Sequence, residues 1–176
     1  PLAQCNNKIN DFLFDYMIIQ LKMVCGAWPP TICGVGEYTN RLVSALTDAE
    51  VYVKKIDISW PSCIAEFKFR SDRRSIVHMQ YPSRGKGYFV LALLYALFQK
   101  MQGSFLVTTV HEYSQSHPLR KLLVILLANL SDRIVFTTNA EFDAAPVLFK
   151  GLKSKIIPIG NNINIDLGSV CNKKPN

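Results

Sequence analysis

The sequence predicts an α/β domain with a doubly wound, mostly parallel sheet. Short apolar runs of strand length alternate along the chain with longer helix-like segments, which is the order of elements in an open α/β sheet. Several of the short runs are continuously apolar and rich in Val and Ile, as in strands that are buried on both faces. The 176 residues suffice for one well-packed domain and are too few for two ordinary ones.

Six segments have the composition of buried strands. The first reads "QLKMVCG" and the fourth "SFLVTTV", both apolar with β-branched residues. We expect strands at about 20–26, 51–58, 75–81, 104–110, 133–138 and 155–159. We expect the strand order 3-2-1-4-5-6 of a Rossmann-like sheet.

Four helices are expected between these strands, with recognisable start and stop signals. Gly103 is a natural stop for the second helix, and Pro118 in the first turn of the third costs no hydrogen bond. Asn139 is a candidate N-cap for the fourth, which Gly151 would close. The expected helices span 36–46, 87–101, 118–130 and 139–149.

Composition divides the chain into three regions. Residues 20–165 carry the Rossmann-like pattern. Residues 1–19, with "INDFLFDYMII", form an N-terminal extension that could be an extra helix or an irregular lead-in. The polar residues 166–176 are typical of a linker or a frayed terminus.

The net charge of +7 favours an anionic partner, such as phosphate groups, nucleic acid or an acidic membrane face. The interleaved basic and aromatic residues typical of nucleic-acid binding are missing, so we expect no nucleic-acid partner. Five cysteines, an odd number, favour a reduced, cytoplasmic setting. The N-terminus has no signal-peptide pattern, and the most apolar run, Tyr88 to Phe98, is too short to cross a bilayer.

The stretch "WPPTICGVGEYTNRLVSAL" follows the first expected strand and places Gly34 and Gly36 at a helix start. A dinucleotide fingerprint would need a third glycine where Thr39 stands, and no G-K-[ST] follows for a P-loop. The amides there suit a phosphate or carboxylate, although a tight turn with capping glycines remains an alternative. Asp57, at the end of the second strand, leaves a nucleotide-cofactor site as a further alternative.

Several segments, taken in order, carry a family resemblance. "KMVCGAWPPTICGVGEYTNRLVSAL" has a first strand, a Gly-rich loop and a helix, and "SIVHMQYPSRGKGY" follows as a third-strand segment. "VTTVHEYS", "DRIVFTTNAEFDAA" and "KIIPIGNNI" complete the series. From about Leu21 to Ile165, the set resembles the N-terminal domain of family-4-like glycosyltransferases of the GT-B fold, of the bacterial polysaccharide or O-antigen type.

The resemblance implies the acceptor-side half of a retaining glycosyltransferase of the hexosyltransferase type. Its partners would be a nucleotide-sugar donor, bound mainly by a C-terminal domain that is absent here, and a saccharide or lipid-linked acceptor. We expect the chain alone to be nearly inactive, and we expect no metal and no cofactor in this half. Whether the chain is a fragment, a split subunit or a degenerate remnant stays open, and a catalytically inactive binding or scaffold module of the same fold is the main alternative.

Candidate site residues lie where the strands end, because ligands of doubly wound sheets collect beyond the carboxyl ends of the strands. The resemblance implies that His111 is catalytic and contacts the donor sugar. Donor phosphates or the acceptor would be bound by Gly34, Val35, Gly36, Glu37, Gln80, Tyr81, Glu112, Thr138 and Asn139. Structural roles remain open for several of them: a helix-dipole partner for Glu37, strand-end polarity for Gln80 and Tyr81, and a cap for Asn139.

Two further features have alternative interpretations. The loop "SRGKGY", with Arg84 and Lys86, is either a grip for an anionic acceptor or a solvated basic loop. The apolar helix at 88–101 either packs fully on the sheet or is partly exposed as a membrane-docking surface. In the second case the protein would be cytoplasmic and peripheral at the inner face of the membrane.

Overall fold

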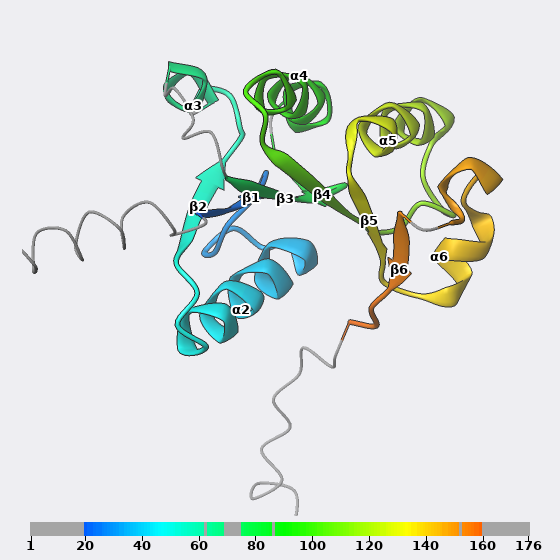
Figure 1. Ribbon diagram of the computed structural model, residues 1–176, viewed down its shortest axis with the longest axis horizontal. Coiled ribbons are helices and arrows are strands. Elements are labelled where there is room, and N and C mark those ends of the chain that lie inside the picture. The colour runs from blue at the N-terminus through cyan, green and yellow to red at the C-terminus, as the bar shows by residue number, and fades with distance from the viewer. Residues whose placement is uncertain (1–19, 62, 69–74, 86, 152, 160–176) are drawn as a thin grey trace, which may run out of the picture.

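The computed structural model describes residues 20–61, 63–68, 75–85, 87–151 and 153–159 (Figure 1). Six strands pair in parallel to form one sheet. Five lie inside the segments expected from the sequence, and the sixth starts one residue early. They are β1 (Leu21–Cys25), β2 (Val53–Asp57), β3 (Ile76–Tyr81), β4 (Phe105–Val110), β5 (Arg133–Phe136) and β6 (Ser154–Ile156).

Helices cover both faces of this sheet, so the predicted doubly wound α/β fold is confirmed. In Figure 1, α2 lies on one side of the sheet and α3, α4 and α5 stand in a row on the other. This division follows from right-handed crossovers that run in two directions from β1. The helices are α2 (Gly34–Asp48), α3 (Cys63–Lys68), α4 (Tyr88–Met101), α5 (Pro118–Leu130) and α6 (Asn139–Ala144), followed by the 3-10 turn η1 (Val147–Phe149).

The expected strand order was wrong. The sheet has the order β2-β1-β3-β4-β5-β6, with Leu21 of β1 paired to Val53 on one side and to Ile76 on the other. After β2 the chain crosses back over β1 through α3 instead of continuing outward. The alternation of strands and helices in the sequence is the same for both orders, so it could not distinguish them. As a result, the connections after β1 and β3 leave in opposite directions, and the topological switch point lies between these two strands.

Two helix ends follow the signals in the sequence. Gly103, in the left-handed region with φ of 80°, ends α4: its N–H donates to Lys100 O at 3.0 Å, and the Ser104 N–H donates to Gln99 O at 3.1 Å. This pair of bonds is a Schellman motif. Pro118 opens α5, and the His117 ring accepts the Leu119 N–H at 3.3 Å.

Two other expectations about helices needed correction. The helix expected at 139–149 ends at Ala144, because Ala145 precedes Pro146 and is extended, with ψ of 149°. Its N-cap is Thr138, whose Oγ1 accepts the Glu141 N–H at 3.1 Å, and not Asn139, which is the first helical residue. The short helix α3 was not expected at all.

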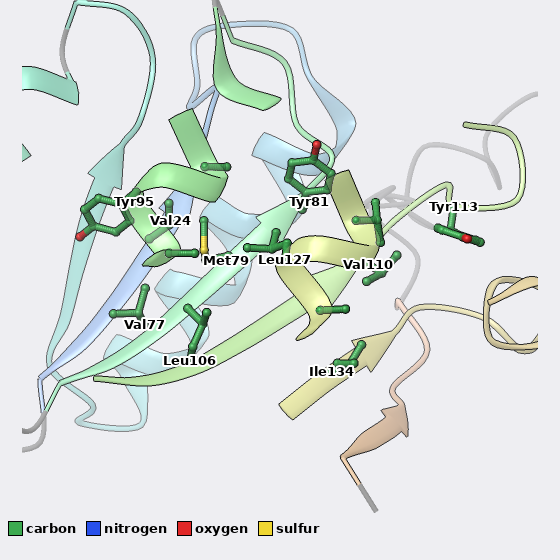
Figure 2. Packing of buried hydrophobic residues seen from close by; sticks show 14 of the residues in the cluster. Val24, Val77, Met79, Tyr81, Tyr95, Leu106, Val110, Tyr113, Leu127 and Ile134 are labelled. Carbon is green, nitrogen blue, oxygen red and sulfur yellow. The ribbon is translucent and has the colours of Figure 1, made fainter. Parts of the chain in front are cut away.

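The core lies between the sheet and the row of α4 and α5. Figure 2 shows five buried residues of this core, one each from β1, β3, β4, β5 and α5: Val24, Met79, Leu106, Ile134 and Leu127. Strand side chains also pack on the α2 side, so the central strands are buried on both faces, as their continuous apolar sequence predicted.

Asp132 ties α4 to the beginnings of β4 and β5. Its carboxylate accepts from Lys100 Nζ at 2.6 Å, and its Oδ2 also accepts the Leu106 N–H at 2.8 Å. Burial alone would raise the pKa of Asp132, but the Lys100 ammonium and the Leu106 N–H outweigh it and lower that pKa below its usual value. The folded protein therefore favours the ionised carboxylate.

Replacing Asp132 with asparagine should lower the free energy of unfolding by about 1 kcal/mol at pH 7, a value reduced for partial solvent screening. The pKa of Asp132 is lower in the folded protein than in the unfolded chain. Its contribution to the free energy of unfolding is therefore complete above the unfolded pKa of about 3.9 and is lost as the pH falls through the folded pKa. Urea unfolding at pH 7 and pH 3 measures this, with Asp143→Asn at an exposed position as the control. An equal difference from wild type at both pH values would contradict the assignment.

Candidate functional site

A cleft of about 750 Å³ opens at the carboxyl edge of the sheet, within the range of small-ligand sites. It lies at the switch point, where the chain leaves β1 towards α2 and leaves β3 towards α4. Its walls come from the N-terminus of α2, the loop 82–85, the first turns of α4 and α5, and Glu112 after β4. The position agrees with the rule that ligands of open α/β sheets bind at the switch point.

The two loops that frame the cleft touch each other through glycines. A Cβ on Gly26 would lie 2.5 Å from Arg84 O, and a Cβ on Gly85 would lie 2.5 Å from Gly26 O. Gly85 also has a φ of 153°, which side chains other than that of glycine rarely allow. These close backbone contacts hold the two walls at a fixed separation.

The N-terminus of α2 presents backbone amides to the cleft. Gly34 and Val35 line it, and the first N–H groups of a helix have no partner within the helix. A Cβ on Gly34 would meet nothing within 4 Å, whereas a Cβ on Gly36 would overlap Ala27 O. Gly34 is therefore open to a ligand, while Gly36 lets the helix pack closely on the loop after β1.

Cys33, the N-cap residue of α2, shows that hydrogen-bond donors converge there. Burial would raise the pKa of its thiol, but the backbone amides of Arg84 and Gly36 and the Ser83 hydroxyl lower it below its usual value. Donors that stabilise a thiolate at this point would also stabilise another anion.

Two arginines add positive charge to the cleft wall. Arg84 Nη1 donates to Ile32 O at 3.3 Å, and the Arg120 guanidinium lies 4.3 Å from the centre of the Phe89 ring. Both arginines line the cleft. Neither Arg120 nor Phe89 was identified from the sequence, although both stand in the first turn of a helix at the carboxyl edge.

Tyr81, the last residue of β3, is 1% exposed, and its hydroxyl is the one buried side-chain polar atom among the described residues without a hydrogen-bond partner. Figure 2 shows this hydroxyl directed away from Leu127 and Met79. Burial raises the pKa of Tyr81 to about 12, against a smaller opposite effect of Arg120. The group is thus a neutral donor near the arginine of the cleft wall.

Glu112 supplies a carboxylate to the cleft. It is exposed and adopts φ of 52°, a conformation that costs a residue with a side chain about 1 kcal/mol or more. Its carbonyl accepts from Ser116 Oγ at 2.7 Å. Two residues further along the chain, Ser114 donates to the carboxylate of Glu141 in α6 through its N–H at 2.8 Å and its Oγ at 2.7 Å, so α6 holds the turn in which Glu112 stands.

His111 lies beneath the cleft surface. It is 4% exposed and contacts Tyr38 of the cleft wall edge to face, with ring centres 5.8 Å apart. Its Nε2 and Gln80 Oε1 are 2.9 Å apart, and Gln80 Nε2 is 3.3 Å from His78 Nε2. With the Gln80 amide in this orientation, the Nε2–H of His111 donates to Gln80 Oε1. His78 Nε2 accepts from Gln80 Nε2 and also from Thr109 Oγ1, which lies at 2.7 Å.

Burial disfavours the charged form of both imidazoles, so both are neutral near pH 7. Burial lowers the pKa of His78 to about 4, and burial together with the charge of His78 lowers the pKa of His111 to about 4. The role of His111 in catalysis stays a prediction. In the observed arrangement it would act as a neutral group behind Tyr38.

The other residues expected at the site lie apart from the cleft wall. Gln80 is fully buried in the histidine network. Glu37 accepts from its helix neighbour Arg41 at 3.0 Å, and Thr138 and Asn139 are at the start of α6 beyond β5. Of the expected residues, Gly34, Val35 and Glu112 line the cleft itself.

No protein-family model matches the chain, and no curated protein matches it significantly. Within the described ranges, no three His, Cys, Asp or Glu side chains come together as a possible metal site. None of the helices described here has the length and apolarity needed to cross a membrane.

The two glycines of α2 should differ when mutated. Gly36→Ala should lower the free energy of unfolding by about 1–3 kcal/mol, because its methyl group would overlap Ala27 O. Gly34→Ala should change it by less than about 0.5 kcal/mol. Thermal unfolding of the two variants measures the difference, and equal melting temperatures would show that Gly36 is not a packing residue.

The buried histidines should make the fold sensitive to mild acid. Since their folded pKa values lie below the unfolded value of 6.5, their contribution is complete above pH 6.5 and is lost as the pH falls towards 4. We expect the free energy of unfolding to fall by about 2 kcal/mol per histidine between pH 7 and pH 5. Urea unfolding gives the free energies, and NMR of the ring protons gives the pKa values directly. Rings of His78 and His111 that titrate near pH 6.5 would refute the buried network.

Proposed function

We propose that this chain is the acceptor-side half of a retaining glycosyltransferase, which moves a sugar from a nucleotide-sugar donor to a saccharide or lipid-linked acceptor. The observation that supports this best is the cleft at the switch point between β1 and β3. It combines anion-binding groups with one carboxylate in a space that fits a small ligand. A diphosphate beside an acceptor hydroxyl has this pattern of charge.

The anionic part of the ligand would lie at the N-terminus of α2. Gly34, Val35, Arg84 and Arg120 line that part of the cleft. Helix N-termini and arginines bind phosphate oxygens through charge-assisted hydrogen bonds. These groups would stabilise the charge that develops on a departing diphosphate.

The acceptor would lie on the side of Glu112. Its carboxylate can accept a hydrogen bond from a sugar hydroxyl, and its strained backbone is held by the turn that Glu141 anchors. Catalysis would then come from fixing the hydroxyl against the donor's anomeric carbon. A second domain would supply most of the donor contacts, so this chain alone would have little activity.

Two alternatives predict different ligands. A binding or scaffold module of the same fold would bind neither diphosphates nor nucleotides at the cleft. A nucleotide-cofactor domain would use Asp57 for a ribose, but Asp57 is at the end of β2 and does not line the cleft. Direct titration separates all three.

Calorimetric titration with UDP, pyrophosphate and NAD tests the proposal. We expect UDP and pyrophosphate to bind, and Arg120→Ala to weaken both at least about tenfold, equivalent to about 1.4 kcal/mol. Arg133→Ala is the matched control, since Arg133 stands at the opposite, amino edge of the sheet. Tighter binding of NAD than of UDP would favour the cofactor domain. Absence of all binding would favour the scaffold module.

A further inference from the structure

Two cysteine thiols meet at one serine hydroxyl beside the cleft. Cys25 is the last residue of β1, and Cys33 precedes α2 as its N-cap. The Ser83 Oγ lies 3.1 Å from Cys25 Sγ and 4.0 Å from Cys33 Sγ. Neither cysteine is in a disulfide. Because one hydroxyl contacts both sulfur atoms, the two thiols are neighbours in space.

The two thiols differ in their access to solvent. Cys25 is 0% exposed, and its Sγ donates to Ala27 O at 3.3 Å. Cys33 is only partly buried and lines the cleft, as Ser83 does. A small reagent that enters the cleft therefore meets the sulfur of Cys33 and not that of Cys25.

The two thiols also differ in reactivity, because the thiolate is the nucleophile in cysteine chemistry. Burial would raise the pKa of Cys33, but the donors at the start of α2 and in the loop 82–85 lower it below its usual value. Burial raises the pKa of Cys25, and the hydrogen bond with Ser83 offsets only part of that rise. A reactive, accessible cysteine beside a second thiol is the arrangement of redox-sensing cysteine pairs.

We propose that Cys33 and Cys25 form a redox pair, in which a hydroperoxide oxidises Cys33 and Cys25 then converts the product to a disulfide. In the first step the Cys33 thiolate attacks one oxygen of the peroxide, and the O–O bond breaks. With hydrogen peroxide, the other oxygen leaves as hydroxide and takes a proton from solvent, and Cys33 becomes a sulfenic acid. In the second step Cys25 Sγ attacks the sulfur of Cys33, and the S–O bond breaks. The oxygen leaves with the Cys25 proton as a second water molecule.

The second step moves the N-terminus of α2. A disulfide needs an S–S distance of about 2 Å, and Cys25 is held in β1 between β2 and β3. The Cys33 side chain must therefore turn inward past the Ser83 hydroxyl. Gly34 follows Cys33 directly and lines the cleft, so we expect its amide to shift away from a bound anion. The disulfide forms without any ligand, and only its effect on phosphate binding rests on the proposed function.

Peptide mass spectrometry of the whole chain tests the redox pair. The reduced protein is treated with hydrogen peroxide, its free thiols are blocked with N-ethylmaleimide in denaturant, and it is cut with trypsin. Cys25 and Cys33 fall in one tryptic peptide, residues 23–41. We expect this peptide to be lighter by two hydrogen atoms and free of maleimide, and dithiothreitol to restore both thiols. In Cys25→Ala, dimedone should trap Cys33 as the sulfenic acid, whereas the matched control Cys171→Ser should form the disulfide as wild type does.

Calorimetric titration with pyrophosphate measures the effect on the cleft. We expect the oxidised protein to bind pyrophosphate at least about tenfold more weakly than the reduced protein, equivalent to about 1.4 kcal/mol. Reduction with dithiothreitol should restore the binding. Equal binding by the two forms would overturn the coupling between the redox pair and the cleft.

Two results would overturn the redox pair itself. Peroxide could leave both thiols open to maleimide, or it could convert Cys33 to the sulfinic acid while Cys25 stays free. Circular dichroism and thermal unfolding check that each variant is folded. The mass measurement contains no phosphate ligand, so a reduced protein that binds no pyrophosphate counts against the proposed function, while the mass of peptide 23–41 decides the redox pair separately.

Discussion

The close contact between the loop that leaves β1 and the loop that leaves β3 is the constraint on which the cleft depends. Gly26 and Gly85 meet backbone to backbone, and Tyr88 packs against Gly26 with its hydroxyl bonded to Gln80 O at 2.7 Å. No side chain larger than hydrogen fits at either glycine without moving the other loop. The N-terminus of α2 and the start of α4 are thereby fixed on opposite sides of one opening.

This contact is possible only because β3 pairs directly with β1. In the order 3-2-1-4-5-6, the loops at the switch point would follow β1 and β4, and the N-terminus of α2 would face a different loop. The observed order places the loop with Arg84 opposite Gly34. Glu112, one strand further along, completes the wall. The same sequence motifs thus form a different site from the one that the expected order implied.

The sequence predicted what depends on local pattern. The central strands could be recognised because they are largely apolar and buried on both faces, whereas the edge strands β2 (VKKID) and β6 (SKI) were indicated by short runs that include Val and Ile. The end of α4 could be recognised because Gly103 adopts the left-handed turn there. The strand order could not be predicted, since it depends on which edge of β1 the chain returns to after β2. The end of α6 was predicted too late in the chain, because Pro146 ends the helix before Gly151 is reached.

For the site, the sequence identified the carboxyl ends of strands but not the direction of individual side chains. His111 and Glu112 are adjacent, yet one is buried under Tyr38 and the other lines the cleft. His111 still follows the line of β4, where its N–H donates to Tyr81 O at 2.8 Å, whereas the chain turns at Glu112 with φ of 52°. Arg120 was missed for a different reason. It belongs to the start of a helix, and only the packing of α5 beside α4 brings it over Phe89.

The helices α4 and α5 are apolar on both their inner and their outer faces. A helix that covers a sheet needs one apolar face, and the buried residues of α4, such as Ala92 and Tyr95, already meet that need. The outer stripe contributes nothing to the core, and exposing it to water has no benefit for folding.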